Sequence, residues 1–319
     1  MEWRTSAGRC AVRRRVVALA ALPFVACSAD DTVTLGRAAP DPLFGDGGRP
    51  VDKINSNGDD EDPTLTADLL QIYFTSRRPG GSGNGDIWFA TRASRTLPFD
   101  IDTLNPAVGE EVNSEYQELS PAISRDGLTL WLASDRPGGL GGLDIWQTER
   151  SSRDAPWGPL SNLTNLNSTS DDVPRPPGEG ELVMPFASQR DGGQFDIYLA
   201  RRTSLQAPFG DPQPIPNLRG DSSGTVQGGF LTDDGLMLFF QRDAEGEGDQ
   251  GDLYLSWRRS LQEPFENENE LRLPLVNTAA RERDPWVNGD HTRFFFASDR
   301  LMGKGFDIFA TTLDLPVFE

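Results

Sequence analysis

The residues best suited to chemistry are two aspartates, Asp62 and Asp284, each directly before a proline at the same step of an internal repeat. Two carboxylates held close together can act as general acid and general base in the hydrolysis of a glycosidic bond. The repeat places Ser120 and Gln227 at this step in two other copies, and no third acid completes a catalytic set. The pair therefore leaves a carboxylate-dependent hydrolase open as one alternative.

A second recurring set of charges flanks a glycine-rich loop, as in the stretch ASDRPGGLGGLDIW at residues 133–146. An arginine opens each loop and an aspartate closes it, and their separation varies from 6 to 10 residues while their identities stay the same. Constant ends with a variable middle predict a charge-assisted clasp at the base of a hairpin, not a ligand loop. The predicted clasps pair Arg78 with Asp86, Arg136 with Asp144, Arg190 with Asp196, Arg242 with Asp252, and Arg300 with Asp307.

Acidic residues concentrate just before the first strand of several copies, in NGDDED (57–62), NSEYQE (113–118) and STSDD (168–172). Solvated surface charge, a calcium site and a face for a basic partner are the three interpretations of such runs. Calcium has weak support, because no DxDxDG loop is present. The candidate residues of a binding face are Asp62, Glu118, Asp172 and Asp284.

Other kinds of site find little support. His291 is the only histidine and stands in the turn NGDH, so we interpret it as a turn residue and predict no zinc site. The glycine-rich stretches precede strands, whereas phosphate binding uses the N-terminus of a helix. We therefore predict no cofactor. Six tryptophans occupy repeat positions that mostly carry Phe or Tyr in other copies and are interpreted as core between blades: Trp88, Trp131, Trp146, Trp157, Trp257 and Trp286.

The elements that must position these residues repeat five times. The aspartates that close the glycine-rich loops are 58, 52, 56 and 55 residues apart, a period near the upper end for a propeller blade. Each copy is predicted to form four short strands with alternating apolar and polar residues. The copies span about 61–112, 118–168, 171–219, 224–277 and 282–313.

The fifth copy lacks its fourth strand, and residues 41–56 resemble the missing piece. We expect the N-terminal segment to complete the last blade, because closing the ring satisfies an otherwise open strand edge. The sequence thus predicts an all-β, five-bladed antiparallel β-propeller over residues 41–319, with six blades as the alternative.

The first 40 residues differ in kind. Five arginines lead into the apolar run of residues 16–26, which is too short to span a bilayer and is typical of a signal peptide over residues 1–26. Cys27 ends that run and is the predicted lipidation site, with residues 27–40 as the linker from the anchor. Loss of residues 1–26 removes five arginines and one glutamate and moves the net charge from −19 to −23, which argues against nucleic-acid partners.

The pattern Ser-x-Arg, glycine-rich loop, Asp-Ile-aromatic, preceded by SRDGLTLWLAS at 124–134, resembles the WD40-like β-propeller repeats of TolB-like periplasmic proteins and OmpA-type outer-membrane proteins. The resemblance covers about residues 41–313 and implies an envelope protein that works by contact with other macromolecules. It does not transfer a function, because propellers host both binding proteins and enzymes.

Residues and resemblance together predict a noncatalytic, monomeric TolB-like lipoprotein of the bacterial envelope, on the periplasmic face of the outer membrane or on the cell surface. It would bind a protein or glycan partner through loops on one face and touch the membrane only through its lipid anchor. The alternative is a carboxylate-dependent glycoside hydrolase of the five-bladed type, with Asp62 and Asp284 as its acids.

Overall fold

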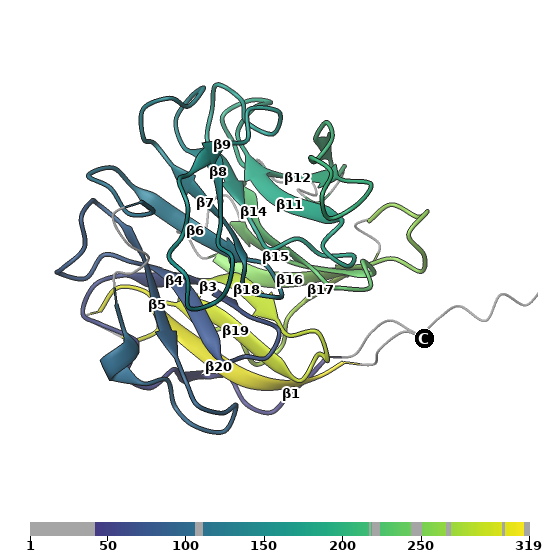
Figure 1. The fold of residues 1–319 in the computed structure, drawn as a ribbon. Helices are drawn as coiled ribbons and strands as arrows, with labels where there is room; N and C mark the ends of the chain where they lie inside the picture. The colour runs from purple at the N-terminus through teal and green to yellow at the C-terminus, as the bar shows by residue number, and fades with distance from the viewer. Residues whose placement is uncertain are drawn as a thin grey trace, which may run out of the picture. The chain divides into compact units, whose positions relative to one another are not determined.

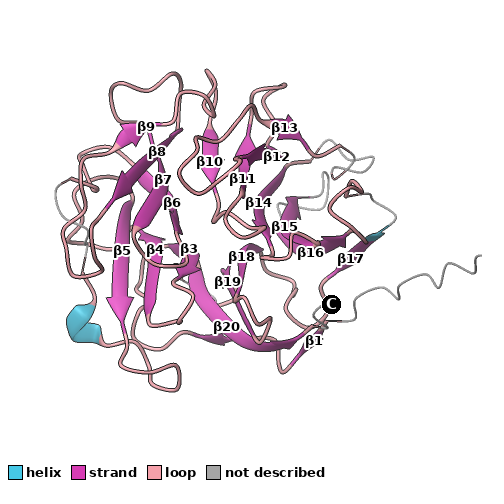
Figure 2. Cartoon of the chain, turned by 45° about the vertical axis from the view of Figure 1, so that its right-hand side comes forward, coloured by secondary structure: helices cyan, strands magenta, loops and turns pink. Residues whose placement is uncertain are grey.

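Alternating apolar and polar residues fold each repeat into a meander of short antiparallel strands, and the five resulting sheets form a ring, the five-bladed β-propeller of Figure 1. This computed structural model describes residues 42–105, 111–216, 218, 224–243, 251–265, 269–301 and 304–315. Figure 2 shows that strands and loops make up almost all of this part of the chain. The predicted leader and linker, Cys27 included, lie outside the described residues.

The blades follow one another along the chain. Blade 1 consists of β3 (Asp60–Leu65), β4 (Gln71–Ser76) and β5 (Asp86–Thr91). Blade 2 consists of β6 (Glu118–Ile123), β7 (Thr129–Ser134), β8 (Asp144–Glu149) and β9 (Ser161–Asn162). Blade 3 consists of β10 (Asp172–Pro174), β11 (Val183–Ser188), β12 (Asp196–Arg201) and β13 (Gln213–Pro214). Blade 4 consists of β14 (Val226–Leu231), β15 (Met237–Asp243), β16 (Gly251–Trp257) and β17 (Glu270–Arg272).

Blade 5 is completed by the N-terminal segment. Its strands β18 (Glu282–Val287), β19 (Arg293–Ser298) and β20 (Asp307–Asp314) are joined by β1 (Leu43–Phe44) and β2 (Arg49–Pro50), which both pair with β20. The predicted closure of the ring is therefore confirmed. Because β18 in turn packs against β3 of blade 1, the described chain forms five blades and not six.

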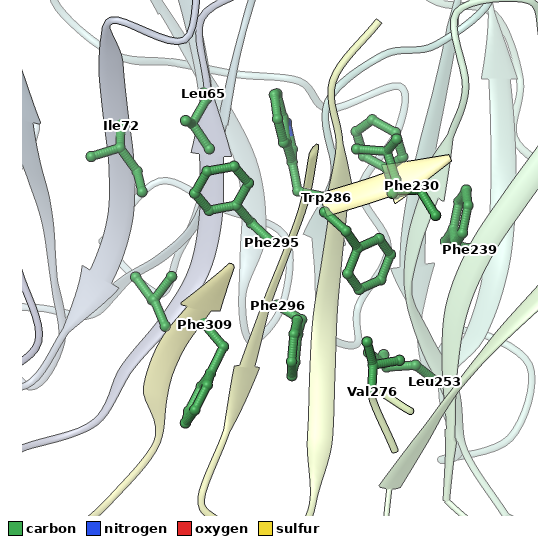
Figure 3. Packing of buried hydrophobic residues seen from close by; sticks show 14 of the residues in the cluster. Leu65, Ile72, Phe230, Phe239, Leu253, Val276, Trp286, Phe295, Phe296 and Phe309 are labelled. Carbon is green, nitrogen blue, oxygen red and sulfur yellow. The ribbon is translucent and has the colours of Figure 1, made fainter. Parts of the chain in front are cut away.

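The largest apolar cluster crosses the junction of blades 4, 5 and 1. Figure 3 shows Phe295 of β19 between Leu65 of β3 and Trp286 of β18. Five of the six tryptophans assigned to the core are buried, and the sixth, Trp257, is half-buried against this cluster. The interpretation of these residues as packing is confirmed.

The ring has two faces with different loops. The turn face carries the turns between first and second strands, such as 66–70 and 124–128, and the loops that follow the third strands, such as 92–100 and 150–158. The loop face carries the glycine-rich loops and the segments that enter each blade. On this face the end of one blade's loop accepts a hydrogen bond from the next blade's first strand, as Gly85 O does from Glu118 N–H (2.9 Å).

The predicted clasps are wrong in their partners. Each loop arginine pairs with a different acid, which in four blades is the first residue of the innermost strand: Asp60 for Arg78, Glu118 for Arg136, Asp172 for Arg190 and Glu282 for Arg300, at 2.5–3.0 Å. In blade 4 the pair is Arg242 with Glu270, at 2.6 Å. Each arginine also donates to a carbonyl 24 residues earlier and stacks on aromatic rings, as Arg78 does on Trp88 (4.8 Å).

The closing aspartates have other roles. Asp86 accepts the N–H of Ser82 (2.8 Å) and Asp144 accepts the N–H of Leu140 (2.5 Å), so both fold the glycine-rich loop onto itself. In blade 4, Asp252 forms an ion pair with Arg272 (2.7 Å). The predicted pairs do not form because each loop arginine extends to an acid on a strand of its own blade. The closing aspartate of blades 1 and 2 therefore accepts N–H groups of the glycine-rich loop instead.

Candidate functional site

A backbone bulge near the start of the innermost strands brings the two candidate aspartates together. The register shifts in β3, β6, β14 and β18, and one residue of each bulge is left-handed: Asp62 (φ 56°), Ser120 (φ 49°), Gly228 (φ 66°) and Asp284 (φ 57°). This conformation costs a non-glycine residue about 1–2 kcal/mol, so the surrounding contacts must hold it. The prediction that Gln227 occupies this step is wrong, because Gly228 does; Gln227 lies one residue earlier and pairs with Gln241.

Arg175 joins the two carboxylates across the ring. It follows β10 of blade 3, and its Nη2 lies 2.9 Å from Oδ1 of Asp62 and contacts Oδ1 of Asp284. The N–H of Asp62 also lies 3.4 Å from Oδ2 of Asp284. All three side chains are buried. The geometry confirms that Asp62 and Asp284 are neighbours and adds a cation between them.

The other carboxylate oxygens also have partners. The hydroxyl of Thr75 donates to Oδ2 of Asp62 (2.9 Å), and Nε of Arg283 donates to Oδ2 of Asp284 (3.0 Å). Glu61, also buried, is contacted by Arg283 and by Arg77. We call these six side chains the axial cluster: Glu61, Asp62, Asp284, Arg77, Arg175 and Arg283. Its three acids are matched by three arginines.

The pKa values of the two aspartates are shifted in opposite directions. Burial alone raises the pKa of Asp62, but attraction by Arg175 and Arg283 and the Thr75 hydrogen bond outweigh it, so this pKa is lowered. Burial, followed by the charge of Asp62, raises the pKa of Asp284 against the pull of the same arginines. Such a separation is what an acid and base pair requires, and it also arises in structural ion networks.

Two cavities lie along the ring axis, one on each side of the axial cluster. The cavity on the loop face has a volume of about 180 Å³ and is lined by cluster residues with Leu119, Leu143 and Phe195. The cavity on the turn face has a volume of about 230 Å³ and is lined mainly by apolar residues, among them Leu65, Ile123, Phe230 and Trp286. We call this second cavity the axial hollow.

The acids assigned to a binding face are not on a surface. Glu118 and Asp172 are fully buried and pair with the loop arginines of their own blades, and Asp62 and Asp284 belong to the axial cluster. The acidic run NGDDED likewise contributes three buried acids, Asp60, Glu61 and Asp62. The interpretation of these acids as solvated or partner-binding charge is therefore wrong, since arginines inside the ring neutralise them.

Sequence reasoning missed Arg175, Arg77 and Arg283. The signal for Arg175 was its position in PRPP, where blades 1, 2 and 5 carry Asp-Pro or Ser-Pro and blade 3 carries Pro-Arg. His291 lies in the turn between β18 and β19, as predicted, with φ 55° and a buried ring whose burial lowers its pKa.

Neither a metal site nor a membrane span is found in the described segments. Among these residues no group of three or more His, Cys, Asp or Glu side chains is placed to hold a metal ion. The calcium hypothesis thus stays without a located site. No helix within the same segments has the length and apolar character needed to cross a membrane.

The fold has counterparts among solved structures. A thermostable family-43 glycoside hydrolase aligns with a TM-score of 0.54 at 9% identity, over 85% of this chain and 94% of its own. The endo-arabinase from Bacteroides thetaiotaomicron VPI-5482 aligns with a TM-score of 0.51 at 13% identity, over 85% and 97%. TolB from Acinetobacter baumannii aligns with a TM-score of 0.46 at 15% identity over 82% of this chain, which spans 55% of that protein's length.

No family model and no curated protein sequence matches the chain. Identities this low carry a likeness of fold and nothing about individual residues. The fold this chain shares with the glycoside hydrolases is the β-propeller.

Proposed function

We propose that this chain is a noncatalytic binding propeller of the bacterial cell envelope. The observation that carries the proposal is the position of Arg175, whose guanidinium contacts both Asp62 and Asp284. A carboxylate that serves as acid or base must lie within hydrogen-bond reach of its substrate. Here that place is filled by the protein's own cation, and the cluster ties blades 1, 3 and 5 together.

The binding surface in this proposal is the turn face. Its axial hollow combines an apolar wall, which includes Phe230 and Trp286, with polar lining groups, among them two ion pairs, Arg95 with Asp290 (3.9 Å) and Arg125 with Asp233 (2.9 Å). An apolar wall beside placed polar groups is typical of sites that receive a side chain or small ligand. We assign to the hollow an apolar side chain of an envelope protein, and a glycan is the competing occupant.

Photo-crosslinking in cells tests the face. A crosslinking residue at Arg125, beside the hollow, should give adducts, whereas one at Leu140, half-exposed on a glycine-rich loop of the opposite face, should not. Digestion of the adduct with protease or with glycan hydrolases identifies the occupant. Adducts from position 140 and none from 125 would contradict the assignment.

The glycoside hydrolase is the second candidate, and one observation favours it: the pKa values of Asp62 and Asp284 are shifted in opposite directions beside the cavity of about 180 Å³. Incubation with arabinan and aryl arabinosides, with hydrolysis as the measured quantity, distinguishes the hydrolase from the binding protein. The binding proposal expects no turnover. Turnover that disappears in Asp62→Asn while the protein stays folded would replace that proposal with the hydrolase.

A further inference from the structure

A second pocket on the turn face lies where the ring closes. The seam pocket, of about 330 Å³, is formed between the closing strand β2, strands β19 and β20 and the loop after β5. Phe99, Phe295, Val51 and Ala310 form its apolar part. Its charged residues are four arginines and one aspartate: Arg49, Arg92, Arg95, Arg293 and Asp46.

The repeat supplies an internal comparison, because the junction of blades 2 and 3 forms the corresponding pocket. Strand register aligns Thr129 with Arg293 and Trp131 with Phe295, and Arg202 and Phe209 take the places of Arg92 and Phe99. The charged residues of that pocket are Asp126, Glu149, Glu181, Arg150 and Arg202, one net negative charge. The seam pocket has three net positive charges in a chain of net charge −19.

Two of the four arginines are departures from the repeat. The position of Arg293, the first residue of the second strand, holds Gln71, Thr129, Val183 and Met237 in the other blades. The position of Arg49, opposite the middle of the third strand, holds Ser161, Gln213 and Leu271 in blades 2 to 4. Neutral side chains thus satisfy the fold at both positions, and packing of a blade does not explain the two charges.

The arginines also retain unused donors. Across the described residues, the guanidinium of Arg293 has no hydrogen bond or ion pair, and it is exposed. Arg92 is fixed by stacking on Phe99 (4.5 Å) and by an Nε–H bond to the Leu69 carbonyl (2.7 Å), which leaves both Nη groups available. Arg95 bonds two carbonyls, and its nearest carboxylate, Asp290, is 3.9 Å away.

Repulsion among the arginines of the seam pocket also indicates an excess of positive charge there. Burial lowers the pKa of Arg92, and the positive charges of Arg293 and Arg95 lower it further. In the corresponding pocket burial also lowers the pKa of Arg202, but there the nearby Glu181 opposes the shift. Positive charge therefore exceeds negative charge at the seam, where the acids near the four arginines are Asp46, 3.1 Å from Arg49, and Asp290, 3.9 Å from Arg95.

We propose that the seam pocket is an anion-binding site that takes a carboxylate or phosphate group, held by Arg293 and Arg92 with Arg49 and Arg95 at its rim. A fixed guanidinium with free Nη groups suits either oxyanion through paired hydrogen bonds. The apolar part of the pocket accommodates the carbon skeleton that carries the group. The proposal does not rest on the axial hollow, although Arg95 lines both pockets. An anion bound in the seam pocket would strengthen ring closure because β2 contributes to this pocket.

Titration calorimetry with citrate and with inorganic phosphate, in low-salt buffer, tests the site. Binding of citrate alone identifies a carboxylate site and binding of phosphate alone a phosphate site, and either anion should raise the melting temperature. Arg293→Gln should weaken binding about tenfold or more, since a charge-assisted hydrogen bond is lost. Arg201→Gln, which removes another exposed charge, in blade 3, should leave binding unchanged.

Arg49→Gln provides a second variant, because Arg49 is 85% exposed and its loss should not affect folding. Its melting temperature without anion should match that of the unmodified protein, while the anion-dependent rise becomes smaller. Failure of both anions to bind, or equal binding by Arg293→Gln, overturns the proposal. The proposal is also overturned if Arg201→Gln weakens anion binding as much as Arg293→Gln does, because the effect would then reflect the net charge of the protein and not the pocket.

Discussion

Replacement of Arg175 by methionine tests whether the axial cluster holds the ring together. The substitution keeps much of the side-chain volume and removes the cation that lies 2.9 Å from Asp62 and also contacts Asp284. Loss of one partner from a buried ion pair costs about 3–5 kcal/mol, because the remaining charge stays buried without compensation. Since Arg175 serves two carboxylates, we expect a loss of about 5 kcal/mol in the free energy of unfolding at pH 7.

The loss should depend on pH. Without Arg175 the main attraction that lowers the pKa of Asp62 is gone, and burial then raises the pKa of both aspartates above the unfolded value of about 4. A raised folded-state pKa contributes stability that is present below the unfolded pKa and is lost as the pH rises through the folded pKa. The penalty of the substitution should therefore be largest at neutral pH and shrink towards pH 4.

Urea unfolding at pH 7 and pH 4.5, followed by the fluorescence of the buried tryptophans, measures both effects. Adding Asp62→Asn and Asp284→Asn to Arg175→Met removes the uncompensated charges and should recover most of the loss. Arg201→Met, which removes a cation 48% exposed at its side chain, should cost less than about 1 kcal/mol. A penalty for Arg175→Met that is equally small, or the same at both pH values, would refute the reasoning.

Three further predictions concern the clasp, the closure and the anchor. In double-mutant cycles monitored by urea unfolding, the effects of Arg136→Ala and Glu118→Gln on the free energy of unfolding should be coupled by about 1–3 kcal/mol, because Arg136 contacts Glu118 (2.8 Å). The effects of Arg136→Ala and Asp144→Ala should be additive within about 0.5 kcal/mol. The reverse pattern would support the Arg136–Asp144 clasp. Deletion of residues 42–50 removes β1 and β2 and opens the edge of β20, so size-exclusion chromatography should show self-association, and a stable monomer would contradict this. Labelling of cells with a radioactive fatty acid should mark the protein and not its Cys27→Ser variant; absence of label, or label in the variant, defeats the predicted anchor.

The blades and their closure could be predicted from the sequence because both depend on local pattern. Strand alternation and turns recur in every copy, and the missing fourth strand of the fifth copy has its counterpart at residues 41–56. The proximity of Asp62 and Asp284 followed from the same register, since blades 5 and 1 must be neighbours in a closed ring. The blades, the ring closure and this proximity, all predicted from the repeat, were therefore confirmed, whereas the position of Gln227 was wrong by one residue.

The partners of the charged residues could not be predicted in the same way. One signal was available: the arginine follows its true acid by 18 residues in four blades, as from Glu118 to Arg136, whereas its distance to the closing aspartate varies. In blades 1, 2 and 5 the interval spans two strands of equal length and one short turn, and in blade 3 a longer connection makes up for the shorter β10. The glycine-rich loop beyond the arginine changes length. Arg175 gave no such signal, since its acids lie on other blades, with Asp284 109 residues away. Arg283 stands next to Asp284, but its other acid, Glu61, is 222 residues away on blade 1.

The arginine content of the chain, 28 against two lysines, follows from the same geometry. A loop arginine such as Arg78 bonds a buried acid and a carbonyl 24 residues earlier while its planar group stacks on Phe74 (5.2 Å) and Trp88 (4.8 Å). A lysine ammonium has neither the flat face nor the fixed fork needed to do all three at once. Since every blade uses one arginine in this way, an arginine that stands outside the pattern, as Arg175 and Arg293 do, cannot be explained by the repeat. Arg175 ties three blades of the ring together, whereas Arg293 carries a charge that packing does not explain, so substitutions at the two positions separate what the fold requires from what the function adds.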